Sequence, residues 1–319
     1  MKYLQNLIAG GAVAIVGLTA CGPAFAWPDK PVEIVVGFAA GGGTDVTART
    51  LALHLGKALG GQVVVTNKAG ASGAIGLGHV ARAKPDGYTL GMTNFPGLLT
   101  LPIERDAGFT TADFTYLGNL VRDPSAFSVT LDSPYKSVAD VIAAAKKAPA
   151  TISYGSTGAG TDDHLQMVMF EELTGTKLLH VPFQGAGPLK NAMLGGHVVI
   201  GGLNLGEVMP QAGKTLRPLA QASAKASSLA SEVPTFKEQG VDLVFASERG
   251  IVAPKGLPAD VEQKLAAALK QIAASPEFQA QMKQQFTEMD YLPGPEWKKR
   301  LDASEANFRK LWSRKRWTE

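Results

Sequence analysis

Four glycine-rich turns, each placed between a β-branched segment and a helical pattern, constrain the fold of this chain more than any other feature. Two lie in the first third of the sequence and two in the middle: 41–45 after the strand candidate 32–36, 70–73 after 63–65, 155–161 after 152–154, and 185–188 after 178–181. Strand, turn and helix repeated in this way predict α/β layers around largely parallel sheets. Because the four units divide evenly along the chain, we expect two lobes.

Other segments complete the predicted architecture. Residues 88–90 and 198–200 are further strand candidates. In the last quarter, Val261, Leu265, Leu269 and Ile272 recur at helical spacing, and Ser275-Pro276 is typical of a helix start with proline at the first position. Another helix is expected after Pro295, so helices finish the chain. Pro188 is expected at the first position of the helix that follows Gly185.

The glycine turns are also candidate anion sites. The start of a helix has unpaired N–H groups and the positive end of the helix dipole, and glycine lets an anion approach the bare backbone. Each helix start is equivalent to roughly half a positive charge, so four that converged would offer about two. For a single turn the simpler interpretation is a tight strand-to-helix connection, and only the even division between two lobes favours binding.

Hydroxyl groups in the same turns could donate to carboxylate oxygens or organise bridging water. They belong to Thr44, Ser72, Ser156, Thr157 and Thr161. Their alternative role is helix capping, which we expect of Thr44 or Asp45.

The N-terminus predicts export. Met1-Lys2, an apolar run from Leu7 to Ala20 and the triplet Ala24-Phe25-Ala26 form a signal-peptide pattern, because the run is shorter than the roughly 20 residues that span a bilayer. Cleavage after Ala26 is favoured, with residues 1–26 as signal peptide. Leu18-Thr19-Ala20-Cys21 also matches a lipoprotein pattern, and a lipid anchor on Cys21 is the alternative.

Composition excludes several classes of function. Cys21 is the single cysteine, so cleavage after Ala26 would leave no thiol for a disulfide, a nucleophile or a metal. The net charge is only +3, with the cationic excess in the C-terminal tail rather than on a basic face, which argues against nucleic acid. A mature chain of roughly 300 residues is long enough for two domains that are stabilised by packing alone, without disulfides.

Enzyme signatures are incomplete. Gly213-Lys214-Thr215 resembles the end of a P-loop, but Val208 stands where its first glycine is required, and there is no Gly-x-Ser-x-Gly elbow. Asp162-Asp163-His164 could act as a general base or bind a metal, yet acidic residues in the first turn of a helix usually favour its dipole. We expect a protein that is not an enzyme and has no cofactor and no metal. An exported hydrolase using these three residues is the remote alternative.

Several segments, in order, resemble the Bug family of extracytoplasmic solute receptors of tripartite tricarboxylate transporters. They cover essentially the whole mature chain and are Trp27-Pro28-Asp29-Lys30-Pro31, Phe38 to Asp45, Asn67 to Gly73, Lys84 to Leu90, Tyr154 to Gly158, Val181-Pro182-Phe183-Gln184-Gly185, Leu194-Gly195-Gly196, Val233-Pro234-Thr235 and Gly250 to Pro254. Each motif alone is weak, but their order and spacing together are specific.

The resemblance implies a type II periplasmic-binding-protein fold: two α/β lobes, joined by two crossover strands, that close on a ligand like a flytrap. Crossovers are expected near 125–130 and 247–250, with lobe 1 made of residues 27–125 plus 248–319 and lobe 2 of 126–247. It also implies a periplasmic receptor, expected to be a monomer, that captures a di- or tricarboxylate or an aromatic acid and delivers it to membrane transporter subunits. A receptor for a signalling partner and an inorganic-anion binder are the alternatives on the same fold.

The candidate ligand-binding residues follow from the turns and from the resemblance. They are Phe38, Gly42, Gly43, Thr44, Asp45, Ala71, Ser72, Gly73, Asn94, Ser156, Thr157, Gly158, Gly160, Thr161, Phe183, Gly185, Leu203 and Arg249.

Three of these candidates either have a second interpretation besides ligand binding or differ from the usual family pattern. Leu203 falls where many members carry an aspartate beside Asn204, which argues against an amino-acid ligand. Arg249 could bind a ligand carboxylate, or be held by Glu248 or a hinge carbonyl. Phe38, like Phe95 and Phe183 beside the turns, could wall an aromatic ligand, although core packing is the stronger interpretation for Phe38.

Overall fold

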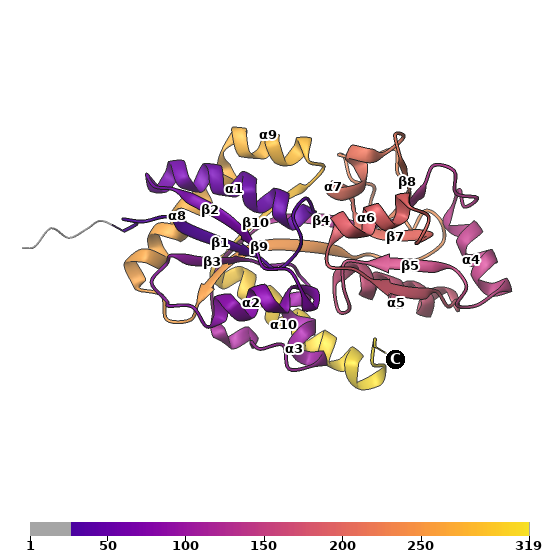
Figure 1. The fold of residues 1–319 in the computed structure, drawn as a ribbon, viewed down its shortest axis with the longest axis horizontal. Helices are drawn as coiled ribbons and strands as arrows, with labels where there is room; N and C mark the ends of the chain where they lie inside the picture. The colour runs from indigo at the N-terminus through magenta and orange to yellow at the C-terminus, as the bar shows by residue number, and fades with distance from the viewer. Residues whose placement is uncertain (1–26, 319) are drawn as a thin grey trace, which may run out of the picture.

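The computed structural model describes residues 27–318. Two α/β lobes lie side by side, and long strands run between them (Figure 1). Both candidate processing sites, Ala26 and Cys21, lie outside the described residues. Within residues 27–318 no helix has both the length and the apolar character needed to cross a membrane.

The sheet of the first lobe has the strand order β2-β1-β3-β9-β4, and β10 also pairs with β4. Its first three strands are parallel, whereas β9 runs antiparallel to β3 and β4. The strands are β1 (Val32–Val36), β2 (Val63–Asn67), β3 (Thr89–Met92), β4 (Phe114–Thr130), β9 (Ala246–Pro254) and β10 (Glu288–Pro293). The predicted parallel arrangement therefore holds for β2, β1 and β3, and the antiparallel strand β9 joins these three strands to β4.

Helices cover the sheet of the first lobe, and three of them come from the C-terminal part of the chain (Figure 1). They are α1 (Gly43–Leu59), α2 (Ala74–Ala81), α3 (Gly97–Glu104), α8 (Ala259–Ala274), α9 (Pro276–Gln284) and α10 (Gly294–Arg314), with short 3₁₀ turns η1 (Ala71–Gly73) and η2 (Thr111–Asp113). The apolar stripe predicted for α8 is buried. Ser275 caps α9 by accepting a hydrogen bond from Phe278 N, with Pro276 at the first position as predicted.

The second lobe is built around the parallel strands β7, β5 and β6, and β8 pairs with the end of β4. The strands are β5 (Ser153–Ser156), β6 (Leu179–Pro182), β7 (Ile200–Asn204) and β8 (Leu216–Gln221), and the helices are α4 (Val138–Lys147), α5 (Asp162–Thr174), α6 (Ala186–Leu194) and α7 (Leu205–Val208), followed by η3 (Met209–Gln211). Gly175 ends α5 in the left-handed conformation that glycine favours.

Two local predictions for this lobe are wrong. The strand expected over 198–200 begins only at Ile200 and continues through Gly201 and Gly202 to Asn204. Both glycines are needed there, because a Cβ on either would overlap Met193 or Tyr154 packed on the strand. Pro188 is the third residue of α6, since Gly185 is the N-cap and the helix begins at Ala186.

Strand β4 connects the two lobes. Its residues from Phe114 to Pro124 pair with β9, and those from Ser125 to Thr130 pair with β7 and β8. The backbone at Ser125 is further tied to Phe245 and Ala222, at the start of the returning connection. A single continuous strand thus passes from one lobe to the other, with β9 beside it.

Candidate functional site

The four glycine turns meet in two pairs across the gap between the lobes. The turn before α1 contacts the turn before α6: Ala39 N donates to Gln184 O at 3.1 Å, and a Cβ on Gly185 would lie 3.3 Å from Ala39 N. The turn at η1 contacts the turn before α5, where a Cβ on Gly158 would lie 2.5 Å from Ser72 Oγ. Glycine is required at these contacts because any side chain would hold the lobes apart.

The start of α1 already binds a carboxylate from the opposite lobe. Gly43 N donates to Glu207 Oε1 at 2.7 Å. The N-cap of α1 is Gly42, which has no side chain to contribute. The expectation that Thr44 or Asp45 caps this helix is therefore wrong, because both lie inside its first turn.

Asp45 instead organises the turn before α1. Its carboxylate accepts hydrogen bonds from Gly41 N at 2.9 Å and from the side chains of Arg49 and Asn67. Burial alone would raise the pKa of Asp45, but these hydrogen bonds together lower it below the ordinary value. Asp45 is thus a fixed anion that shapes the turn.

The turn before α5 is satisfied largely by side chains of its own lobe. Asp163 Oδ2 accepts from Thr157 N at 3.2 Å and from Thr157 Oγ1 at 2.6 Å. Ser156 Oγ accepts from Gly158 N, and His164 Nδ1 accepts from Gly160 N at 3.1 Å. The hydroxyls predicted as ligand donors therefore also hold this turn in shape, with Thr161 as the N-cap of α5.

The cluster Asp162-Asp163-His164 does not converge on one reacting point. Asp162 accepts from Asn204 and Ser125, Asp163 bonds to Thr157, and the His164 ring stacks on His180 with centroids 4.1 Å apart. Burial raises the pKa of Asp162 to about 6, burial also raises the pKa of Asp163 well above its ordinary value, and burial lowers the pKa of His164 to about 3. Each side chain thus supports a different part of the lobe.

A narrow pocket lies where the first turn, the third turn and the fourth turn face one another. Of the predicted site residues, those that line it are Phe38, Gly42, Gly43, Thr44, Asn94, Thr157 and Gly185. A small adjoining pocket is lined by Ser72 and Gly73, again with Phe38 and Asn94. Phe38 is only 9% exposed, so it contributes to the core of the first lobe and to the pocket wall at once.

Other predicted residues do not line this pocket. Ala71, Ser156, Gly158, Gly160, Thr161 and Asp45 belong to the turns without lining the pocket, and Leu203 is fully buried in the core of the second lobe. Phe183 packs against that same core, and Phe95 lies at a separate hollow beside α10.

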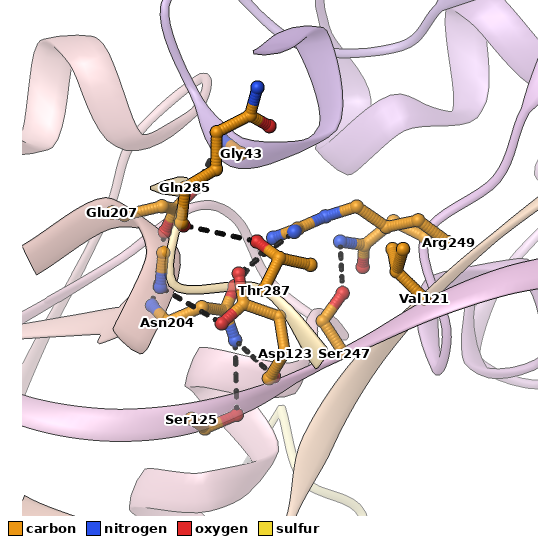
Figure 2. Close-up of polar contacts among 12 residues, drawn as sticks. Gly43, Val121, Asp123, Ser125, Asn204, Glu207, Ser247, Arg249, Gln285 and Thr287 are labelled. Atoms are coloured by element: carbon orange, nitrogen blue, oxygen red, sulfur yellow. Dashed lines mark hydrogen bonds and ion pairs between the residues drawn. The ribbon is translucent and has the colours of Figure 1, made fainter. Parts of the chain in front are cut away.

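Arg249 is held inside the protein. Its Nη1 donates to Asp123 Oδ2 at 2.8 Å and its Nη2 to Asn204 Oδ1 at 3.2 Å (Figure 2). Glu248, the partner considered from the sequence, instead binds Arg300. The Arg249 guanidinium packs directly against Gly43, so it supports the start of α1 from beneath.

Three further residues line the pocket that were not among the predicted site residues: Ala186, Asn204 and Glu207. Asn204 and Glu207 form a capping box at α7, in which Glu207 Oε2 accepts from Asn204 N at 3.1 Å. The Asn-x-x-Glu spacing is a sequence signal for a helix start and could have located Glu207 beside the cleft. No cluster suited to a metal ion occurs among residues 27–318.

Comparison with known proteins agrees with this architecture. Residues 47–299 match the family TctC, described as "Tripartite tricarboxylate transporter family receptor". The chain belongs to this family. A Cupriavidus necator relative described as "UPF0065 protein in gbd 5'region" is 35% identical over 272 residues, which cover 85% of this chain and 83% of the relative. Bordetella pertussis "Protein BugT" is 32% identical over 254 residues, with 78% of each chain covered.

Solved structures show the same fold. "Structure of periplasmic binding protein BugD" superposes with a TM-score of 0.85 at 32% identity, covering 90% of this chain and 98% of the other. "R. palustris Rpa4515 with adipate" gives a TM-score of 0.86 at 30% identity, with 90% and 97% covered. The fold is therefore that of a periplasmic solute-binding receptor, and the Bug-family resemblance seen in the sequence is confirmed.

Proposed function

We propose that this receptor binds a small organic carboxylate in the pocket between its lobes. The observation that supports the proposal is the contact between Gly43 N and Glu207 Oε1, in which the start of α1 already binds a carboxylate within this cleft. The related R. palustris receptor was solved with adipate, a carboxylate, which supports the same ligand class here.

The proposal extends to transport. A receptor of this family would present its ligand to the membrane subunits of a tripartite tricarboxylate-type transporter, as a monomer in the periplasm. The lobes would be residues 27–125 plus 248–319 and residues 126–247, hinged at Ser125 and Ser247. The change of pairing partners along β4 supports the first hinge position.

Titration calorimetry on the purified mature receptor tests the ligand class. The panel is citrate, succinate, terephthalate, aspartate and nicotinate, with inorganic phosphate as the competing anion. We expect at least one organic acid to bind and phosphate not to displace it. Failure of every organic acid to bind or to raise the melting temperature, or displacement by phosphate, would contradict the proposal.

A further inference from the structure

Glu207 places a negative charge inside the pocket, at the position most suited to an anion. Its side chain comes from α7 of the second lobe and reaches the first turn of α1 in the first lobe (Figure 2). The residue is only 7% exposed. A ligand carboxylate cannot occupy the same N–H group unless Glu207 leaves it.

The Glu207 carboxylate is also well satisfied where it lies. Oε1 accepts from Gly43 N at 2.7 Å and Oε2 accepts from Asn204 N at 3.1 Å. Both donors are backbone N–H groups at helix starts, which favour a negative charge. Glu207 therefore has hydrogen bonds of its own and does not depend on a cationic group of the ligand.

Little positive charge remains in the pocket to balance the negative charge of a ligand. The pocket is bordered by the turns that open α1, α5 and α6, and the starts of these three helices together amount to roughly one and a half positive charges. Glu207 offsets about one of these, Asp162 in the first turn of α5 offsets part of the rest, and the charge of Arg249 is balanced by Asp123 at 2.8 Å. One ligand carboxylate would complement the remainder, whereas two would leave an uncompensated negative charge in a buried site.

The hydrogen-bonding groups lead to the same result. Several turn donors are already used within the protein: Gly41 N by Asp45, Thr157 N by Asp163, Gly158 N by Ser156 and Gly160 N by His164. Asn94, which lines the pocket, has a buried Oδ1 without a hydrogen-bond partner among the described residues. An acceptor in this position suits a ligand with one carboxylate better than a ligand with two.

We propose that Glu207 is a specificity-determining residue that takes the place of a second ligand carboxylate, so that this receptor selects monocarboxylates over dicarboxylates of the same skeleton. The inference rests on the proposed function and narrows it. It also gives Glu207 a role in closure, since its hydrogen bond to Gly43 N joins the two lobes.

The test uses matched acids that differ only at one end: hexanoate, adipate and 6-aminohexanoate, and benzoate, terephthalate and 4-aminobenzoate. Calorimetry at pH 7.5 compares the wild-type receptor with Glu207→Ser and Glu207→Gln. Glu207→Gln keeps an oxygen that can accept the Gly43 N–H, so it remains informative if the shorter serine prevents folding. Glu232→Gln removes the same charge from an exposed position of the second lobe and is the matched control.

We expect the wild type and Glu232→Gln to bind the monocarboxylate of a pair at least about tenfold more tightly than the dicarboxylate, and Glu207→Ser to reverse or abolish that preference. A wild-type preference for the dicarboxylate, or a ratio unchanged in both Glu207 variants, would overturn the inference while leaving carboxylate binding intact. Tightest binding of the amino acids, lost in the Glu207 variants, would overturn it by assigning Glu207 to an ammonium group. Absence of binding by every acid to every variant would instead contradict the proposed function itself.

Discussion

The Arg249 guanidinium and the Asp123 carboxylate form an ion pair at 2.8 Å, with side chains that are 1% and 0% exposed. The pair lies under the start of α1, because Arg249 packs against Gly43, and Asp123 also accepts the N–H of Gly206, in α7, at 3.0 Å. The ion pair therefore connects α1 on one side of the cleft with α7 on the other, and it does not line the pocket.

Removing one member of this pair should cost far more than removing both. Arg249→Met leaves Asp123 as an unpaired buried charge, and we expect a loss of about 3–5 kcal/mol in the free energy of unfolding. The double variant Arg249→Met/Asp123→Leu should recover most of that loss. Urea unfolding followed by circular dichroism measures both, and equal losses in the single and double variants would show that the pair does not act as a unit.

The loss in Arg249→Met should depend on pH. Burial raises the pKa of Asp123 to about 7, although Arg249 lowers it in part. Without Arg249 that pKa rises further, so the folded protein keeps a proton that the unfolded chain releases above its ordinary pKa near 4. The loss should therefore be smaller at pH 5 than at pH 8, and the same urea experiment at both values would reject this account if the order were reversed.

Gly43→Ala should weaken ligand binding from beneath the pocket. The backbone of Gly43 is helical, so alanine is not excluded by conformation, but its Cβ would overlap the buried Arg249 guanidinium. We expect a destabilisation of about 1–3 kcal/mol and a loss of carboxylate affinity. Calorimetry with unchanged affinity in Gly43→Ala would argue against the role given to Arg249.

The stacked histidines should make the second lobe sensitive to acid. Burial lowers the pKa of His180 to about 4, and burial together with His180 lowers that of His164 to about 3. Between pH 6.5 and 4 these histidines bind protons in the unfolded chain but not in the folded protein. Their contribution to stability therefore falls as the pH falls. His180→Phe should lose less stability than the wild type between pH 7.5 and 4.5.

The comparison concerns how steeply the melting temperature falls with pH in each protein, and not the absolute melting temperature. His180 Nε2 also bonds Ser156 Oγ at 2.7 Å, so the variant is expected to start from a lower melting temperature at pH 7.5. Buried Asp162 and Asp123 act in the opposite direction on acidification in both proteins and cancel in the difference. Parallel melting-temperature profiles would exclude the histidine pair as the acid-sensitive element.

Ala71→Gly should stabilise the receptor slightly. Ala71 has a φ of +48° at the start of η1, a conformation that costs an L-residue about 1–2 kcal/mol and glycine almost nothing. The extra freedom of glycine in the unfolded chain offsets about half of this gain. A net gain of about 0.5–1 kcal/mol is expected in urea unfolding, and a loss would mean that the methyl group makes a contact that outweighs the strain.

Local patterns were sufficient to predict the elements that carry the site. The four glycine turns, the buried stripe of α8 and the Ser275-Pro276 helix start all depend on residues close together in sequence, where propensity and capping dominate. The order of the family motifs predicted the two-lobe fold. Strand β7 was misplaced because Gly201 and Gly202 resemble a turn in sequence, whereas in the fold they make room for Met193 and Tyr154.

The sequence by itself determined the α/β elements and the backbone donors at the glycine turns, because those features follow from short-range periodicity and from glycine, and the resemblance of its motifs to a family indicated a receptor. Only the tertiary structure decided which donors face the pocket between the lobes. Glu207 lies 164 positions from Gly43, and Arg249 lies 126 from Asp123, yet each pair is in direct contact. Such pairings depend on how the two lobes pack around β4 and β9, and no local sequence pattern indicates a contact between charges that lie far apart in the chain.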